Sequence, residues 1–144
     1  DVDWGYVGDI EEVNVRVLDM LFQEGIVPVL SPITYGIDGY VLNTNADSIA
    51  AAVAEALAES YEVELIYCFD KKGVLKDLKD ENSVISVLTH NDYEYYKAMG
   101  ILNTGMLPKL ANAFSSLKKG VSSVRLVHPE DISRTDTGTQ IVLS

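Results

Sequence analysis

Two continuous apolar runs on either side of a helical segment constrain the fold of this 144-residue chain most strongly. The first run, IVPVLSPI, occupies residues 26–33, and the second, VELIYCF, occupies residues 63–69. A continuous apolar run of this length is typical of a parallel strand that is covered on both faces. Residues 46–60, which lie between the runs, are rich in alanine and predict a helix. Strand, helix and strand in this order predict a βαβ unit with parallel strands and a right-handed crossover.

Further helices and strands continue this alternation along the chain. Glycines bracket the turn of a predicted hairpin in TYGIDGYVLN. Asn14 and Gly25 are suited to begin and end one helix, and Thr89 and Gly100 are suited to begin and end another. The other elements are a helix in GMLPKLANAFSSLKKG, extended pieces in WGYVGDIEEV, KKGVLKD and ENSVISVL, and strands in SSVRLV and TQIVL. Together they predict a single α/β domain over residues 1–144, a three-layer αβα sandwich with a mainly parallel central sheet.

The composition argues against two classes of partner. The formal net charge of −11 disfavours binding to a nucleic-acid backbone. The longest apolar stretch, around residues 49–57, is interrupted by Glu55 and is too short to span a bilayer.

The start DVDWGYVGD lacks the basic and apolar parts of a signal peptide, so we expect a cytoplasmic location. The chain also begins with Asp1 rather than methionine, within a pattern already under way, so we expect a fragment of a longer protein.

Cysteine and histidine residues give no sign of a metal site. Cys68 is the one cysteine, and its place in VELIYCF predicts an inert thiol in a buried strand. His90 and His128 are far apart in sequence and are not spaced as ligands with Cys68. We therefore expect no metal ligands among the side chains.

Four polar stretches follow predicted strands or begin predicted helices, where α/β proteins bind ligands: NTNAD, CFDKKG, NTGMLPK and TGT. None of them matches the nucleotide-binding patterns GxxxxGK[ST] or GxGxxG. The absence of these two patterns does not exclude a nucleotide, so each stretch is considered on its own residues.

The stretch NTGMLPK, residues 103–109, could bind an anion. Gly105 would let the backbone approach an anion at the start of a helix, and Pro108 needs no N–H group in the first turn. Lys109 lies about one turn into this helix and could direct its ammonium group to the same anion. On spacing alone, a plain helix start with a solvated lysine is the more frequent case.

The stretch NTNAD, residues 43–47, allows two interpretations. Asn45 is a good N-cap, and Asp47 in the first turn would interact favourably with the helix dipole. Capping does not explain Asn43, and three hydrogen-bonding side chains would also suit a polar ligand, with Asp47 orienting cations. Residue chemistry alone leaves the two interpretations equally supported.

Asp70 follows the second apolar run and precedes Lys71 and Lys72. A turn is the more frequent structure for such a sequence. The alternative is the rim of a nucleotide pocket.

In order along the chain, the motifs WGYVGDIEEVN, GIVPVLSPI, GYVLNTNADSIA, YCFDKKGVL, NTGMLPKL and TGTQI cover nearly all 144 residues. This ordered set resembles the C-terminal half of the acetylglutamate kinases of the amino acid kinase family. The resemblance implies transfer of the γ-phosphoryl group of ATP to the side-chain carboxylate of an N-acyl-glutamate, in arginine biosynthesis. A carboxylate acceptor is already ionised at neutral pH, so this reaction requires no general base.

The resemblance also implies roles for individual residues. Lys109 would neutralise charge on the transferred phosphoryl group, and Asp47 would hold Lys109 in position. Asn43, supported by Asn45, would contact the α-carboxylate of the acyl-glutamate. The residues implied in the nucleotide pocket are Asp70, Gly105 and Met106.

The chain departs from the family pattern in its missing N-terminal half. In the family, that half supplies a lysine in a K-x-G-G stretch, an H-G-G-G loop, and most of the acyl-glutamate pocket and dimer contacts. This chain contains neither motif, so we expect the segment alone to be inactive. The resemblance implies ATP and N-acyl-glutamate as partners, Mg²⁺ held mainly by the phosphates, and a homodimer at full length. Two alternatives stay open: another amino acid kinase, and a non-catalytic module that binds a nucleotide or an amino acid.

Overall fold

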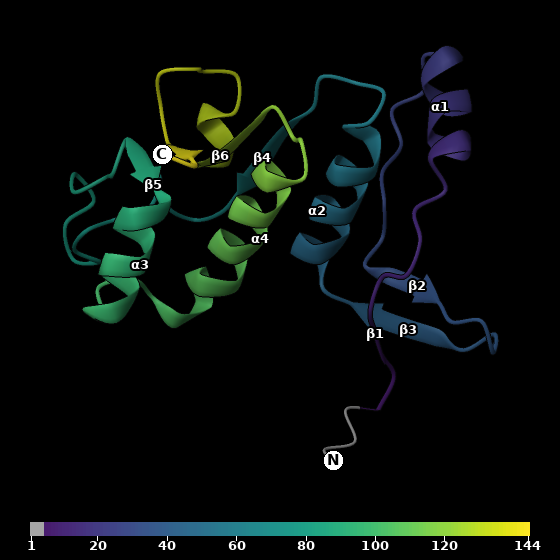
Figure 1. The fold of residues 1–144 in the computed structure, drawn as a ribbon, viewed down its shortest axis with the longest axis horizontal. Helices are drawn as coiled ribbons and strands as arrows, with labels where there is room; N and C mark the ends of the chain where they lie inside the picture. Colours follow the sequence, from purple (N-terminus) through teal and green to yellow (C-terminus); the bar gives the residue numbers. More distant parts are fainter. Residues whose placement is uncertain (1–4) are drawn as a thin grey trace.

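The computed structural model describes residues 5–144, and Trp4, at the start of the extended piece predicted in WGYVGDIEEV, lies outside them. The α-helices are α1 (Val15–Gln23), α2 (Ala46–Leu57), α3 (His90–Ala98) and α4 (Leu107–Lys118). Two short 3₁₀ helices are η1 (Thr104–Met106) and η2 (Pro129–Asp131). The strands are β1 (Val7–Gly8), β2 (Ile33–Tyr35), β3 (Val41–Thr44), β4 (Glu64–Cys68), β5 (Val87–Thr89), β6 (Ser123–Val127) and β7 (Thr139–Val142). Helices and strands are interspersed along the chain, as the α/β prediction requires (Figure 1).

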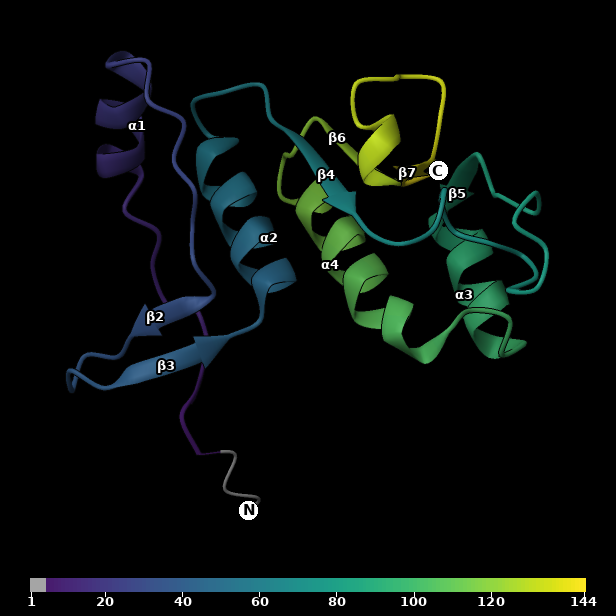
Figure 2. The same cartoon turned by 180° about the vertical axis from the view of Figure 1, so that it is seen from behind.

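The strands form two sheets, which Figures 1 and 2 show from opposite sides. The first has the order β1-β3-β2 and the second the order β4-β6-β7-β5. Three of the five strand pairings described are parallel, namely β1 with β3, β4 with β6, and β5 with β7. The α/β class with mostly parallel pairing is therefore confirmed. The predicted βαβ unit is wrong, because residues 26–31 form no strand and β2, which begins at Ile33, lies in a different sheet from β4.

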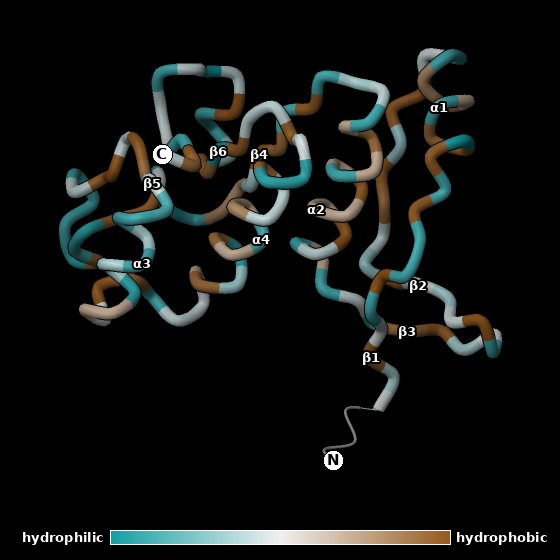
Figure 3. The backbone as a smooth tube through the Cα atoms, viewed as in Figure 1, coloured by the Kyte–Doolittle hydropathy of each residue, from teal (hydrophilic) through white to brown (hydrophobic). Residues whose placement is uncertain are grey.

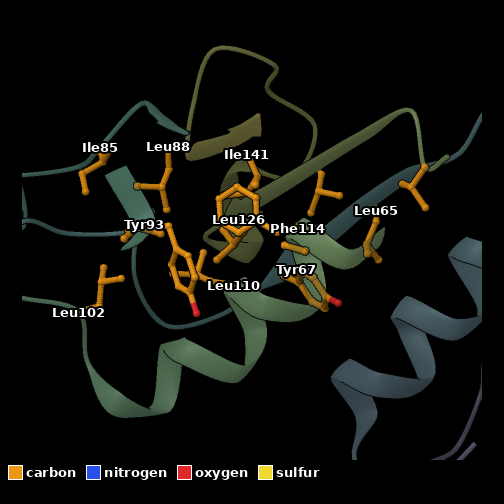
Figure 4. Close-up of a cluster of buried hydrophobic side chains, with 14 of the residues drawn as sticks. Leu65, Tyr67, Ile85, Leu88, Tyr93, Leu102, Leu110, Phe114, Leu126 and Ile141 are labelled. Carbon is orange, nitrogen blue, oxygen red and sulfur yellow. The ribbon is translucent and has the colours of Figure 1, made fainter. Parts of the chain in front are cut away.

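The hydrophobic core lies between the second sheet and the helices α2, α3 and α4. Leu110 and Phe114 of α4 pack in this core with Leu88, Leu126 and Ile141 of the sheet, as Figure 4 shows. The four leucine and isoleucine side chains of this set are at most 1% exposed. The helix predicted in GMLPKLANAFSSLKKG is therefore confirmed as α4, and its buried apolar residues fix it against the sheet.

Local signals in the sequence set the ends of several elements. Asn14 Oδ1 accepts a hydrogen bond from Val17 N at the start of α1, and Thr89 forms a capping box at the start of α3. Gly39, in the turn between β2 and β3, has a φ of 79°, which glycine adopts without strain. The two predicted helix starts and the predicted hairpin are thus confirmed.

The apolar run at residues 26–33 is not a buried strand. Residues 26–31 form neither helix nor strand, and β2 begins only at Ile33. Val27 is 85% exposed and Val29 is 94% exposed, in the apolar segment that Figure 3 shows between α1 and β2. The prediction fails because no neighbouring strand of residues 5–144 pairs with residues 26–31 of this run.

Cys68 is exposed, so the prediction of a buried thiol is wrong. In β4 the side chains alternate, with Leu65 and Tyr67 buried and Cys68 on the open face. The run VELIYCF therefore forms a strand with one well-covered face rather than two.

None of the helices described for residues 5–144 has the length and apolarity needed to cross a bilayer.

Candidate functional site

Helices α2 and α4 lie side by side, and their N-terminal ends point the same way (Figures 1 and 2). Toward their C-terminal ends, Glu55 of α2 accepts a hydrogen bond from Ser116 and forms an ion pair with Lys119 at 2.8 Å. At their N-terminal ends, Asp47 of α2 contacts Lys109 of α4. Because the N-terminal end of a helix carries a partial positive charge, two such ends together favour an anion.

The Lys109–Asp47 ion pair joins the first turns of the two helices. Lys109 Nζ lies 2.5 Å from Asp47 Oδ1, although the two residues are 62 positions apart. The Lys109 side chain is 14% exposed and that of Asp47 is 34% exposed. The pair is thus partly shielded from water but remains accessible from one side.

Tyr67 of β4 contacts both members of this pair. Lys109 Nζ lies 4.8 Å from the centre of the Tyr67 ring, within the range of a cation–π interaction. The Tyr67 hydroxyl donates a hydrogen bond to the main-chain oxygen of Asp47 at 3.2 Å. Burial raises the pKa of the Tyr67 phenol, and the charges of Asp47 and Glu55 raise it further. The phenol is therefore protonated at neutral pH and acts as a donor.

Asn43 and Asn45 lie at the entrance to α2. Asn45 is the N-cap, and its Oδ1 accepts a hydrogen bond from Ser48 N at 3.1 Å. Asn43 is exposed near the end of β3, with its backbone paired to Val7 and Ile33. Asp47 does not cap the helix, so capping and the ion pair are divided between two residues.

Gly105 lies in η1, which leads directly into α4. Its N–H group donates to Asn103 Oδ1 at 3.0 Å, so the local fold already uses the N–H group that we expected an anion to approach. A Cβ atom at Gly105 would meet only the Asn103 Oδ1 atom, at an ordinary contact distance of 3.7 Å. Packing within residues 5–144 therefore does not require a glycine here.

Asp70 is exposed at the carboxyl end of β4 and lies on the rim of two hollows. One hollow, of about 220 Å³, also includes Lys71, Lys72 and His128. The other, of about 110 Å³, includes Met106. The structure thus brings Asp70 and Met106 to one hollow, whereas Gly105 does not line it.

The TGT stretch at residues 137–139 has a structural function. Thr139 is fully buried, and its Oγ1 accepts from Val74 N at 2.8 Å and donates to Ile85 O at 2.6 Å. These bonds fix the segment that follows Asp70 to the second sheet. The stretch therefore holds the rim of the hollows in place.

Sequence reasoning missed Tyr67 and Asn103. A tyrosine in an otherwise aliphatic buried strand is a usable signal, because a buried hydroxyl needs a hydrogen-bond partner. Asn103, two residues before Gly105, has the position of a side chain that caps a short turn. The sequence thus indicates that the Tyr67 hydroxyl and the Asn103 side chain each form a hydrogen bond, but it does not identify the partner residue of either.

The arrangement suits a ligand with several negative charges. A lysine held by a carboxylate and an aromatic ring, at two helix N-termini, provides fixed positive potential for a phosphate group. Among residues 5–144, no group of three or more His, Cys, Asp or Glu side chains is placed to hold a metal ion.

Comparisons with known proteins relate this arrangement to kinases. The family model for the amino acid kinase family matches residues 1–128. The acetylglutamate kinase of Azobacteroides pseudotrichonymphae is 49% identical over 142 residues, covering 99% of this chain and 55% of that protein. The chain spans about half the length of the curated relatives that it matches.

Solved structures share the fold. The crystal structure of smu.665 from Streptococcus mutans UA159 matches with a TM-score of 0.82 and 31% identity, over 98% of this chain and 53% of that one. N-acetylglutamate synthase from Neisseria gonorrhoeae, complexed with coenzyme A and L-arginine, matches with a TM-score of 0.82 over 97% of this chain and 33% of that one. At 18% identity, the second match concerns the fold alone. The predicted amino acid kinase-like fold is confirmed.

Proposed function

Because this chain belongs to the amino acid kinase family, we propose that it is the nucleotide-binding C-terminal lobe of an acetylglutamate kinase. The intact protein, with an N-terminal substrate lobe, would transfer the γ-phosphoryl group of ATP to the side-chain carboxylate of N-acetyl-glutamate. The reaction forms an acyl phosphate and ADP and belongs to arginine biosynthesis. The similarity to acetylglutamate kinases along nearly the whole chain supports this choice of acceptor.

The contact between Lys109 and Asp47 carries the proposal. Phosphoryl transfer depends on positioning and on stabilising charge that spreads over the phosphoryl oxygens, rather than on covalent help from the protein. The Lys109 ammonium, fixed 2.5 Å from Asp47 at two helix N-termini, has the charge and position for this task. Asp47 keeps the ammonium directed toward the phosphates.

The other predicted residues complete two binding regions. Asn43, supported by Asn45, binds the α-carboxylate of the acyl-glutamate beside the start of α2. Asp70 and Met106 line the nucleotide hollow, and the small size of Gly105 lets the triphosphate pass close to η1. Mg²⁺ is held mainly by the phosphates of ATP.

Replacing Lys109 by alanine in the intact protein tests the catalytic role. We expect kcat to fall by about 100-fold or more, because a fixed positive charge on the transition state is lost. The acyl phosphate is measured by trapping with hydroxylamine. Lys119→Ala is the matched control, since it removes the other ion pair between α2 and α4 while leaving the first turns intact. Equal turnover in the two variants would contradict the role of Lys109.

The choice of acceptor separates the proposal from its alternatives. N-acetyl-glutamate or another N-acyl-glutamate should be phosphorylated in preference to free glutamate and aspartate, whereas another amino acid kinase would prefer a different acceptor. A non-catalytic module would bind ATP or an amino acid without forming any acyl phosphate.

A homodimer in the cytoplasm completes the proposal. It is supported by the similarity to acetylglutamate kinases. Light scattering of the intact protein measures the oligomeric state.

A further inference from the structure

We propose that Tyr67 is a positioning residue for phosphoryl transfer, and that its ring holds the Lys109 ammonium while its hydroxyl holds the first turn of α2. The inference rests on the proposed function of the Lys109–Asp47 pair. It adds a third element, β4, to a site that sequence reasoning assigned to two helices.

The burial of Tyr67 makes it a rigid support. Its side chain is 4% exposed and packs in the core of the second sheet. Figure 4 shows its hydroxyl pointing away from Leu110 and toward α2, where it bonds the main-chain oxygen of Asp47. A side chain locked in this way cannot move far without disturbing the core.

The two contacts of Tyr67 act on different parts of the pair. The ring face meets Lys109 Nζ at 4.8 Å, and an ammonium over an aromatic face is attracted to its negative potential. The hydroxyl bonds the main chain of Asp47 rather than its carboxylate, which is left to Lys109. Tyr67 therefore restricts the ammonium from one side while Asp47 attracts it from another.

The ring also covers part of Lys109. With the ring in place, the lysine side chain is only 14% exposed, and a charge shielded from water acts more strongly on a nearby phosphoryl group. A flexible aliphatic side chain at position 67 would fill some of the space but would offer no attraction to the ammonium. The ring should therefore matter more to turnover than the hydroxyl.

A set of variants in the intact protein tests this inference. We expect Tyr67→Leu to lower kcat about 10-fold, with KM for ATP changed less than about 3-fold, because the lysine acts mainly on the transition state. Tyr67→Phe keeps the ring and should retain kcat within about 3-fold of wild type. If Tyr67→Leu does not fold, Tyr67→Met removes the ring with an unbranched side chain that adapts to the space, and it should show the same fall.

Leu65→Ala is the matched control for damage to the core. Leu65 lies two residues earlier on the same buried face of β4 and is 7% exposed. This variant should lose stability but keep the turnover of its folded fraction. Wild-type kcat in Tyr67→Leu, or an equal fall in Leu65→Ala, would overturn the inference.

A chemical measurement tests the contact independently of catalysis. The rate at which acetic anhydride acetylates Lys109, relative to Lys119 in the same molecule, should rise several-fold in Tyr67→Leu and stay near the wild-type value in Tyr67→Phe. An unchanged ratio in Tyr67→Leu would refute the contact. If the wild-type protein forms no acyl phosphate, the proposed function fails while this ratio still decides whether Tyr67 holds Lys109.

Discussion

At the scale of single residues, Asn45 and Asp47 have different tasks although they are two positions apart. Asn45 Oδ1 accepts the hydrogen bond from Ser48 N that caps α2. The carboxylate of Asp47 is directed instead to Lys109. Residue chemistry predicted the cap at Asn45, but it could not decide whether Asp47 only favours the helix dipole or also orients a cation.

Single substitutions at these two residues should therefore have different effects. Asn45→Ala removes the cap and should lower the free energy of unfolding by about 1 kcal/mol, measured by urea denaturation.

Asp47→Asn keeps the shape of the side chain but no longer holds the ammonium of Lys109, so kcat should fall with little loss of stability. If instead Asp47→Asn lowers the melting temperature and its folded fraction turns over normally, the Asp47 side chain has only a structural role.

The resemblance named Lys109 and Asp47 and implied their pairing, but it did not name Tyr67 or its contacts with them. Lys109 and Asp47 were assigned by resemblance, and the distance between them depends on how α4 packs beside α2. Tyr67 was not assigned at all, since a tyrosine in a strand gives no indication of which helix it will meet. Side-chain chemistry is local, whereas a site joining three elements is a product of tertiary packing.

At the scale of elements, the segment from Asp70 to Ser86 depends on one buried threonine of β7. Thr139 Oγ1 bonds both Val74 N and Ile85 O. A Cβ atom at Gly73 would lie 2.7 Å from the same Oγ1 atom, so this approach requires a glycine. The segment is thereby held against the second sheet, with Asp70 at the rim of the nucleotide hollow.

Thr139→Val should loosen this segment while conserving volume. The variant leaves a buried N–H group and a buried carbonyl without the hydroxyl, which should lower the free energy of unfolding by about 1–3 kcal/mol. Because the segment carries Asp70, KM for ATP should rise as well. Thr137→Val is the matched control, since the Thr137 hydroxyl lies at 3.4 Å or more from its acceptors. Similar losses in both variants would show that the two threonines contribute equally.

Elements with local signals were predicted well, and elements that depend on distant partners were not. The helices and the hairpin have caps and glycines that act within a few residues. The run at residues 26–33 has the composition of a strand, but a strand also needs neighbours to bond. None of the neighbours described for residues 5–144 pairs with residues 26–31, so their apolar side chains stay exposed.

At the scale of the whole molecule, apolar burial is unevenly distributed. Most of the buried side chains belong to α2, the second sheet, α3 and α4. The region before α2 exposes large apolar residues instead, among them Val27, Val29, Tyr35 and Ile37. Exposed apolar surface of this extent marks a site of interaction. In the proposed kinase, the N-terminal lobe is the part of the protein available to cover it.

Hydrogen–deuterium exchange of the intact protein should detect this covering. If the N-terminal lobe pairs with residues 26–31, the amides of Val27, Val29 and Leu30 should exchange about as slowly as those of β6, because strand hydrogen bonds open only with the core. The exposed loop at residues 133–136 provides the fast-exchanging reference in the same sample. Exchange of the three amides at the rate of this loop would contradict the expected pairing. In that case the N-terminal lobe would have to contact the chain elsewhere, and the exposed apolar surface would be left for the second subunit of the proposed dimer.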